Sequence, residues 1–308
     1  MSEHTTCWCG NDKLLDFSPA YRKCPSCGTL VLHFWPDDDV TNVQDTGELY
    51  GSDYYLRHLP QEYGYPSLET RARSDISERV LFWAETLLRY KLPPSNVLEL
   101  GSAHGGFVAF LRQAGFNASG LELSPWLVSF SQSLFEIPVL QGPLEKQDIE
   151  PGSLDAIVLM DVLEHLPDPL GTMRLALNLL APDGILLIQT PCVPEEKSYA
   201  ELVDREDPFL AQFKEKEHLF LFSQRSVTDF FAKLDCPTVI FEQAIFAHYD
   251  MFLVASRISP RQSSPDEISA SLQATSNGRI AQGILDLYEQ NRSHLLKLQD
   301  AQAQLQDA

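Results

Sequence analysis

The chain has 308 residues and a formal net charge of −20, from 23 Lys and Arg against 43 Asp and Glu. Such a surface repels phosphate backbones, which argues against nucleic acid as a substrate. With 44% hydrophobic residues the chain can bury one full α/β domain and a smaller unit. Its apolar runs are too short to cross a membrane and its polar start does not resemble a secretory signal, so we expect a cytoplasmic protein.

Four of the six cysteines lie within the first 27 residues, namely Cys7, Cys9, Cys24 and Cys27. A cytoplasmic protein seldom uses disulfides, so this cluster predicts a metal site. A glycine follows each pair and permits the tight bend that turns two thiolates toward one ion. We expect a structural zinc ion in a small hairpin unit over residues 1–36; a metal-free, degenerate knuckle is the alternative. Four thiolates leave no open position for catalysis.

Residues 37–92 are predicted to connect this unit to the main domain. The stretch 37–66 is rich in Asp, Tyr and Gly, and it is either a linker whose aromatic side chains pack on the next domain or a lid over the active site. From Leu68 to Tyr90 apolar residues recur at helical spacing, which predicts a helix that Pro93 ends.

Strand and helix patterns alternate from residue 93 to residue 257. The expected strands cover 97–100, 117–123, 137–140, 154–160 and 184–190, and the expected helices cover 106–114, 125–135, 169–180 and 223–234. The segments 238–246 and 249–256 are expected to form a closing antiparallel pair. Strands that alternate with helices indicate a parallel sheet covered on both faces, which is a Rossmann-like α/β fold.

The composition changes in the segment 258–308, where a linker rich in Ser and Pro precedes a helix expected from Ile268 to the end. A heptad seam in this helix is traced by Ile284, Leu287, Asn291, Leu298 and Leu305. Asn291 places a polar residue at a core-type position, as some dimeric coiled coils do. A single amphipathic helix and a coiled coil that joins a homodimer or a partner both fit this pattern.

Polar residues gather where three of the expected strands end. The first strand leads into Glu99–Gly105, the second ends at Glu122, and the fourth leads into Met160–Pro169. Open α/β sheets bind ligands at these carboxyl ends, and glycines let the backbone approach a ligand closely. A carboxylate at Glu122 can accept hydrogen bonds from ribose hydroxyls. This much fits NAD as well as S-adenosylmethionine.

The spacing of the first loop separates these two cofactors. Gly101 and Gly105 do not reproduce the G-x-G-x-x-G pattern that shortens the approach to a pyrophosphate. The carboxylate of Glu99 would repel a pyrophosphate, whereas it suits a cofactor that carries an ammonium and a sulfonium. The loop therefore favours S-adenosylmethionine.

Residues 97–256 resemble class I S-adenosylmethionine-dependent methyltransferases, and within that class the group that contains the ubiquinone-type O-methyltransferases. The matching segments, in order, are 97–107, 120–124, 161–169, 179–191 and 217–223. The cysteine unit is similar to the N-terminal zinc module of bacterial sugar C-methyltransferases and of some methyltransferases associated with surface glycans.

The resemblance implies cofactor-binding roles for the positions that match. Glu99 and the loop from Gly101 to Gly105 would hold the methionine part, and Glu122 would hold the ribose. The remaining positions are Leu123, Pro143 and Leu144 at the adenine, Asp161 at the methionine side, and Ser102, Ala103 and Phe107 in or beside the loop.

One position of the loop departs from the family pattern. Ala103 stands where the pattern has its middle glycine, and we expect the extra methyl group to be tolerated. His104, next to it, is expected to be a surface or loop residue rather than a base.

Methyl transfer from a sulfonium is an in-line displacement, so an enzyme mainly aligns the reactants and excludes water. A hydroxyl acceptor also needs a base, commonly a histidine near neutral pH. His165 and His218 are the candidate bases, and the alternative is that each holds a loop in place. Glu164 is expected to be structural, bridging its loop to a helix N-terminus. The candidate acceptor-site residues, chosen on position alone, are Tyr54, Tyr55 and Tyr249.

Three classes of function stay open. The favoured one is a methyltransferase that acts on a small molecule or a sugar- or glycan-related acceptor, with transfer to oxygen. The second is another S-adenosylmethionine-dependent transferase, such as a protein methyltransferase. The third is a non-catalytic S-adenosylmethionine-binding module, attached to a larger assembly through the zinc unit and the C-terminal helix.

Overall fold

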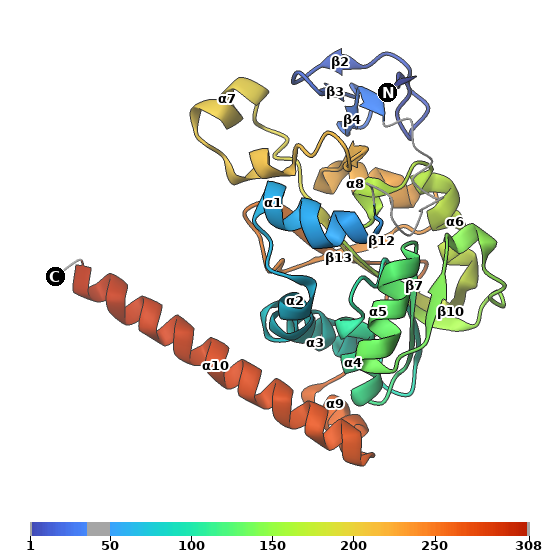
Figure 1. The fold of residues 1–308 in the computed structure, drawn as a ribbon, viewed down its shortest axis with the longest axis vertical. Coiled ribbons are helices and arrows are strands. Elements are labelled where there is room, and N and C mark those ends of the chain that lie inside the picture. The colour runs from blue at the N-terminus through green and yellow to red at the C-terminus, as the bar shows by residue number, and fades with distance from the viewer. Residues whose placement is uncertain (1, 36–49, 307–308) are drawn as a thin grey trace.

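The computed structural model describes residues 2–35 and 50–306, and it shows a layered α/β domain joined to a small N-terminal unit (Figure 1). The sheet of this domain has seven strands in the spatial order β12, β13, β10, β9, β6, β7, β8. Their bounds are β6 Asn96–Leu100, β7 Asn117–Glu122, β8 Val139–Gln141, β9 Leu154–Met160, β10 Leu180–Pro191, β12 Thr238–Glu242 and β13 Asp250–Ser256. Strands β6 to β10 pair in parallel, and β13 is antiparallel to both its neighbours. The predicted Rossmann-like fold and closing pair are confirmed.

The chain reverses its direction of travel across the sheet between β6 and β9. It moves from β6 through β7 to β8 on one side, then crosses back to place β9 and β10 on the other. Val97 of β6 pairs with Ala118 of β7 and with Ala156 of β9. Ligands of open α/β sheets bind at such a reversal, beside the carboxyl ends of the strands. The loops that follow β6, β7 and β9 therefore meet at one place.

The helices of the domain follow the predicted pattern closely. Their bounds are α4 Gly106–Gln113, α5 Pro125–Phe135, α6 Pro169–Leu179 and α8 Gln224–Ala232, with shorter helices η3 Leu144–Lys146, η4 Leu163–His165, α7 Tyr199–Asp204 and η5 Pro208–Gln212 between them. Ser124 caps α5 by accepting from the amide of Leu127, and Ser223 caps α8 by accepting from the amide of Ser226. In both places a serine side chain satisfies a free amide of the first helical turn.

Two apolar cores flank the sheet, because successive side chains of a strand point to opposite faces. Ile157 and Leu159 of β9 pack in one core with α6, α8 and the N-terminal unit. Ala156 and Val158 pack in the other core with α3 and α4. The sheet is thus covered on both faces, and only the ends of its strands are free to build a site.

The segment before β6 is helical as predicted, but it is divided. It comprises α2 (Leu68–Asp75), a π-helical turn η2 (Ile76–Val80) and α3 (Leu81–Tyr90). Upstream lie a further π-helical turn η1 (Tyr54–His58) and α1 (Leu59–Tyr63), whereas residues 37–49 of the predicted linker or lid lie outside the described residues.

Strand β10 starts before the predicted strand 184–190 does. β10 begins at Leu180, which pairs with Leu154 of β9, and the register then shifts before Ile185. The segment between Leu180 and Ile185 is therefore an irregularity within the strand, since a strand can continue past one or more unpaired residues.

The N-terminal unit shares both a sheet and a core with the main domain. Its strands β2 (Leu15–Asp16), β3 (Tyr21–Lys23) and β4 (Leu30–Leu32) form a sheet that β11 (Phe220–Leu221) completes, while β1 (Ser2–Glu3) pairs with β5 (Phe34–Trp35). The ring of Trp8 lies 5.1 Å from that of Phe230 in α8. The unit is consequently built onto the main domain.

The C-terminal helix differs from its prediction in two ways. It starts at Pro265, where Ser264 and Glu267 form a capping box, and it is split into α9 (Pro265–Gln273) and α10 (Ser276–Gln306). Helix α10 packs on the main domain at its start and then extends away from it (Figure 1).

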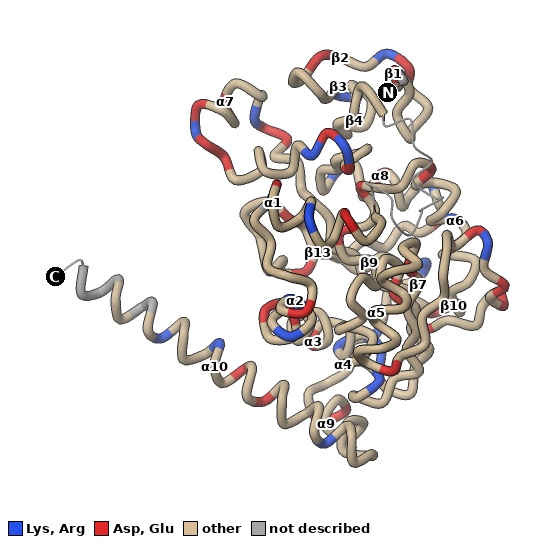
Figure 2. Tube along the Cα trace, in the orientation of Figure 1, with Lys and Arg blue, Asp and Glu red and all other residues tan. Residues whose placement is uncertain are grey.

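No helix of the described residues is both long and apolar enough to cross a bilayer. Acidic residues are spread along the described part of the chain (Figure 2).

Candidate active site

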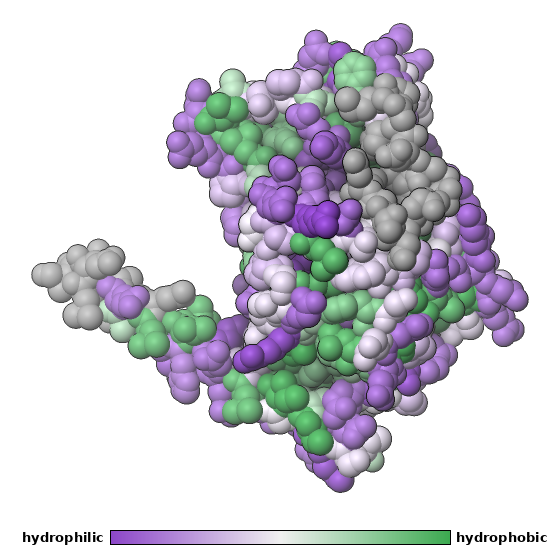
Figure 3. Space-filling model, viewed as in Figure 1, coloured by the Kyte–Doolittle hydropathy of each residue, from purple (hydrophilic) through white to green (hydrophobic). Residues whose placement is uncertain are grey.

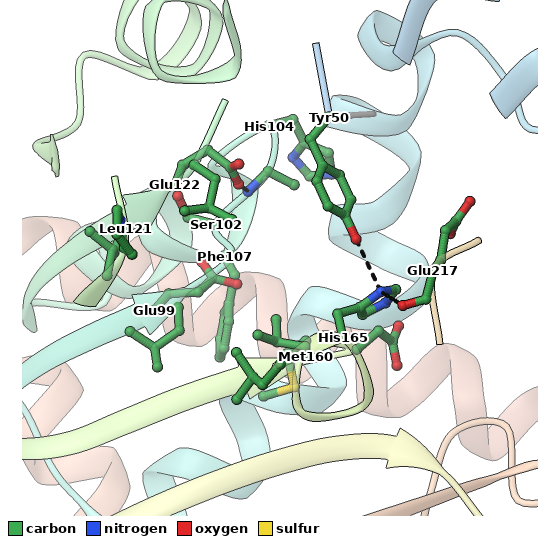
Figure 4. A pocket seen from close by; sticks show the side chains of 18 of the residues that line it. Tyr50, Glu99, Ser102, His104, Phe107, Leu121, Glu122, Met160, His165 and Glu217 are labelled. Carbon is green, nitrogen blue, oxygen red and sulfur yellow. Dashed lines mark hydrogen bonds between the residues drawn. The ribbon is translucent and has the colours of Figure 1, made fainter. Parts of the chain in front are cut away.

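A cavity of about 620 Å³ lies at the carboxyl ends of β6, β7 and β9 (Figure 4). Its floor and sides come from the loops after these strands and after β8, and from α2, η2 and α3. Residues of η1 and α1 line it as well. Every predicted cofactor-binding residue except Gly105 lines this cavity. Its size falls within the range of small-molecule pockets.

The loop after β6 has left-handed backbone at three alternating positions. The φ angles are +69° at Gly101, +45° at Ala103 and +82° at Gly105. A Cβ atom at Gly105 would lie 2.9 Å from the Cβ atom of Ser131, which cannot rotate away, so this glycine is favoured by packing as well as by conformation. Ala103 adopts the conformation that suits the glycine of the family pattern, and its methyl group is accommodated with local strain.

Two polar atoms on the wall of the cavity lack a partner. The Oε2 atom of Glu99 and the Oγ atom of Ser102 are buried and have no hydrogen-bond partner among the described residues. Leaving such atoms unsatisfied is costly, so they mark where a ligand would bring hydrogen-bond donors. Burial, and then the nearby Glu122 carboxylate, raise the pKa of Glu99 well above its ordinary value. A cation bound here would have the opposite effect on this pKa.

Glu122 joins the end of β7 to the loop after β6. Its Oε2 atom accepts from the amide of Ala103 at 3.0 Å, and its Oε1 atom accepts from the amide of Ser124 at 2.9 Å. Burial raises the pKa of Glu122, and these backbone donors offset part of that effect. Each carboxylate oxygen can accept a second bond, which leaves capacity for a pair of hydroxyl donors.

The apolar side of the cavity lies beside the end of β7. The amide of Gly142 donates to the carbonyl of Glu122 at 2.9 Å, which brings Pro143 and Leu144 next to Leu123 at the cavity wall. These side chains offer the flat apolar surface that a purine ring needs.

Asp161 lies on the opposite side of the cavity, after β9. Its backbone is left-handed, with a φ angle of +60°. Its Oδ1 atom accepts from the side-chain Nε2 atom of Gln189 at 3.0 Å. The Oε1 atom of Gln189 in turn accepts from the indole N–H of Trp83 at 3.0 Å. This chain of hydrogen bonds orients Asp161 from two separate elements.

The two histidines predicted as bases lie in contact but in different positions. His165 lines the cavity, whereas His218 lies behind it and is 2% exposed; their ring centroids are 4.8 Å apart. Burial is the main cause that lowers the pKa of His165 to about 3 and the pKa of His218 well below its ordinary value. Burial therefore favours the neutral form of both rings, and a role of either histidine as the base stays a prediction.

Glu164 and His104 both differ from their expected surroundings. Glu164 is fully buried and accepts from the hydroxyl of Thr190 at 2.9 Å, instead of bridging to a helix N-terminus. His104 lies in the loop, as expected, but it is buried: its Nε2 atom lies 3.0 Å from the Oδ2 atom of Asp75, and its Nδ1 atom accepts from the backbone amide of Gly106 at 3.1 Å. Contacts with α2, which is distant in sequence from the loop, bury His104.

An aromatic group covers the cavity on the side away from the sheet. Tyr50, Tyr54, Tyr55 and Tyr65 line it, while Tyr249 is not among the described lining residues. The hydroxyl of Tyr50 lies 3.1 Å from the Nδ1 atom of His165 (Figure 4). The aromatic side chains of residues 50–65 thus pack at the cavity, as both the predicted linker and the predicted lid would.

Sequence reasoning missed three charged residues of the cavity wall. Arg71, Asp75 and Arg79 line it from α2 and η2. They recur at intervals of four residues, which places them on one face of a helix. This polar stripe on an otherwise apolar helical pattern was the available signal.

The four clustered cysteines come together in the N-terminal unit. Their sulfur atoms all lie within 4.8 Å of one another, and the Cys7–Cys27 and Cys9–Cys24 pairs are each 3.6 Å apart. Sulfur atoms at 2.3 Å from one tetrahedral zinc ion lie about 3.8 Å apart. The cluster therefore fits a zinc ion with little movement.

Comparison with known proteins decides the family. A family described as methyltransferase domain matches residues 69–239, more than half of the chain. The chain belongs to this family. It is a class I S-adenosylmethionine-dependent methyltransferase, with a match that begins in α2, upstream of the predicted domain start at residue 93.

Curated relatives match only part of this methyltransferase. The ubiquinone biosynthesis O-methyltransferase of Xanthomonas campestris pv. campestris (strain B100) is 32% identical over 108 residues, which cover 33% of this chain and 45% of the relative. The protein of the same name from Xanthomonas axonopodis pv. citri (strain 306) is 29% identical over 102 residues, covering 31% and 43%. The chain thus spans less than half the length of these relatives.

The solved structures that the chain resembles are distant in sequence. A methyltransferase from Thermotoga maritima aligns with 67% of this chain and all of its own at a TM-score of 0.46 and 16% identity. The CMeT domain of the citrinin polyketide synthase aligns with 63% of this chain and 56% of its own at a TM-score of 0.46 and 17% identity.

Proposed function

We propose that this methyltransferase transfers a methyl group from S-adenosylmethionine to a small-molecule or sugar- or glycan-related acceptor, with oxygen as the receiving atom. One observation carries the cofactor assignment: the unpartnered Oε2 atom of Glu99 and Oγ atom of Ser102, both buried at the strand-end cavity. These acceptors suit an ammonium and its neighbouring donors. A dinucleotide would instead bring phosphates against the carboxylate of Glu99.

Different residues of the cavity wall bind different parts of the cofactor. Glu99 and the loop 101–105 take the amino-acid end, Glu122 accepts from the ribose hydroxyls, and Leu123 with residues 143–144 takes the adenine. Bound there, S-adenosylmethionine supplies a methyl group on a positively charged sulfur. The protein binds the cofactor and the acceptor, aligns them and excludes water from the cavity. The aromatic cover from residues 50–65 assists in excluding water.

The acceptor is proposed to lie between the aromatic cover and the loop after β9. Tyr50, Tyr54 and Tyr55 present flat apolar rings and hydroxyl groups, a combination that suits a ring-shaped acceptor with hydroxyl substituents. The curated relatives are named as O-methyltransferases, which supports oxygen as the receiving atom. Of the two histidines, His165 is proposed to face the acceptor, because it lines the cavity.

Isothermal titration with S-adenosylmethionine tests the cofactor site. We expect the purified chain to bind it, and Glu99→Gln and Glu122→Ala each to weaken binding at least tenfold, about 1.4 kcal/mol. Glu196→Gln, at an exposed carboxylate outside the cavity, is the control and should bind normally. An absence of heat with the unaltered chain would count against the proposal.

The acceptor class is tested by transfer of labelled methyl from S-adenosylmethionine. We expect label in phenolic or sugar-containing small molecules of a cell extract. Label confined to protein would favour the protein methyltransferase alternative, and tight cofactor binding without any transfer would favour the non-catalytic module.

We also propose that Cys7, Cys9, Cys24 and Cys27 hold one structural zinc ion. The distances between their sulfur atoms support this assignment. Elemental analysis of freshly purified protein should find this zinc, and Cys24→Ser should lose about one equivalent of it. An unchanged zinc content in Cys24→Ser would exclude the four-thiolate site.

A further inference from the structure

A second group of metal-ligating side chains lies beside the proposed acceptor position. Glu164, His165 and His218 each offer one ligand atom, and the three atoms lie within 4.8 Å of one another. The Nε2 atom of His165 is 3.9 Å from the Oε1 atom of Glu164. Glu164 and His165 follow β9, whereas His218 precedes β11, so the fold brings them together across more than fifty residues.

The carboxylate of this group has an unused oxygen. Glu164 is fully buried, and although its Oε2 atom accepts from Thr190, its Oε1 atom has no hydrogen-bond partner among the described residues. This is the oxygen that lies toward His165. A fully buried carboxylate oxygen is stabilised only by a hydrogen-bond donor or by a cation. The unpartnered Oε1 atom of Glu164 therefore indicates that a donor or a cation binds beside it.

Both histidines are oriented as metal ligands usually are. The Nδ1 atom of His165 donates to the carbonyl of Glu217 at 2.9 Å, and the Nδ1 atom of His218 donates to the carbonyl of Gln212 at 2.9 Å. A carbonyl can only accept, so each Nδ1 atom carries the proton and each Nε2 atom keeps its lone pair. Backbone carbonyls bonded to the outer nitrogen fix the tautomer and ring orientation of metal-bound histidines in the same way.

We propose that Glu164, His165 and His218 bind a divalent transition-metal ion, such as zinc, manganese or iron(II), at the edge of the methyltransferase cavity. Two imidazoles and one carboxylate are the ligand set that such ions use when they keep open positions. Ligands about 2.1 Å from a shared ion lie about 3.4 Å apart in a tetrahedron, so the three atoms would close up by about 1 Å.

The open position of this ion would face the cavity, because His165 is a lining residue and is 20% exposed at its side chain. We infer that a hydroxyl oxygen of the acceptor is the ligand that takes this position, a step that rests on the proposed function. The binding of the ion itself is independent of that function.

Cobalt substitution of the whole chain tests the site without relying on activity. The purified protein is stripped of metal, reloaded with Co²⁺, and examined by elemental analysis and absorption. We expect about two Co²⁺ per chain: one with strong thiolate charge-transfer bands from the cysteine cluster, and one with only weak ligand-field bands. The Glu164→Gln and His165→Gln variants should each keep the thiolate bands and lose the second ion.

The thiolate bands and S-adenosylmethionine binding serve as internal checks that each variant is folded. His165→Gln covers the case in which the fully buried Glu164 does not tolerate change, because His165 is partly exposed. An unaltered protein whose bound Co²⁺ shows only the thiolate site, or a second ion that persists in a folded variant, would overturn the proposed site. A second ion without S-adenosylmethionine binding would uphold the site and refute the proposed function.

Discussion

At the scale of single residues, the loop after β6 shows how one substitution can be tolerated at a cost. Ala103 has a φ angle of +45°, a conformation that costs an L-residue about 1 kcal/mol more than it costs glycine. The hydrogen bond from its amide to Glu122 holds it there. The loop keeps its shape because neighbouring contacts impose it.

Ala103→Gly is therefore expected to stabilise the protein by about 0.5–1 kcal/mol, since relief of the strained backbone outweighs the added freedom of the unfolded chain. Denaturant unfolding measures the change. The matched control is Ala109→Gly within α4, which should destabilise by a similar amount because its backbone is helical. A loss of stability in both variants would contradict the strain at position 103.

The buried carboxylate of Glu99 lowers the stability of the empty protein, although it is proposed to bind the cofactor. Burial raises the pKa of Glu99 well above its ordinary value, so the folded protein holds this proton more tightly than the unfolded chain does. The contribution of Glu99 to stability is consequently lost as the pH rises above the ordinary pKa of a glutamate. At pH 7 Glu99 opposes folding of the empty protein.

We expect Glu99→Gln to raise the stability of the empty protein at pH 7, by about 1 kcal/mol, while it abolishes most of the affinity for S-adenosylmethionine. Thermal unfolding at pH 7 and pH 5 measures the first effect, and the gain should shrink at pH 5. For the unaltered protein, affinity should fall as the pH drops, and binding below neutral pH should release protons, giving heats that depend on the buffer. Heats that are independent of the buffer would argue against the raised pKa.

At the scale of elements, helix α10 has two apolar faces with different surroundings. Ala281 and Leu285 are buried against the main domain, whereas the seam residues Ile284, Leu287 and Leu298 are exposed. Figure 3 shows apolar side chains on the part of α10 that extends away from the body. The side chain of Leu305, the last seam residue, lies outside the described residues. The exposed seam leaves open both a single amphipathic helix and a coiled coil, and dimerisation stays a prediction.

Leu287→Glu combined with Leu298→Glu should therefore convert a dimer to a monomer, since two charges at seam positions of each helix cannot be buried together. Analytical ultracentrifugation measures the mass. Gln290→Glu, on the same helix but off the seam, is the control and should leave the mass unchanged. If the unaltered protein sediments as a monomer at micromolar concentration, the prediction of a dimer is wrong.

At the scale of the whole molecule, the N-terminal unit and the cavity are parts of one structure. Phe220 of β11 pairs with Val31 of β4, and the hydroxyl of Tyr21 donates to the carbonyl of His218 at 2.9 Å. Strand β11 begins two residues after His218. The N-terminal unit consequently holds the segment that carries His218 in place.

Removal of zinc by a chelator should therefore lower the unfolding temperature of the entire protein in a single transition, without a separate early melting of residues 2–35. Calorimetry measures this. Trp8→Ala should act in the same direction, at about 3–5 kcal/mol, because the ring is buried against Phe222 and Phe230. Leu15→Ala, at a side chain 59% exposed, should change stability by less than about 0.5 kcal/mol. Two resolved transitions would show that the unit is an independent domain.

The sequence alone determined the order and type of the elements of the main domain. Local signals were enough for this, as Ser124 and Pro125 at the start of α5 and the apolar run of β9 show. The strand-end positions of Glu99, Glu122 and Asp161 followed from the same order, because parallel strands all end at one edge of the sheet.

Only the tertiary structure decided which distant segments meet. The pairing of β11 with β4, the burial of His104 against Asp75 and the approach of His218 to His165 each join parts of the chain that are between 29 and 191 positions apart. A local pattern carries no information on such contacts, because they depend on the packing of whole faces. The same reason explains α10: its heptad pattern marked an apolar seam, but only packing showed that the neighbouring face, with Leu285, covers the domain.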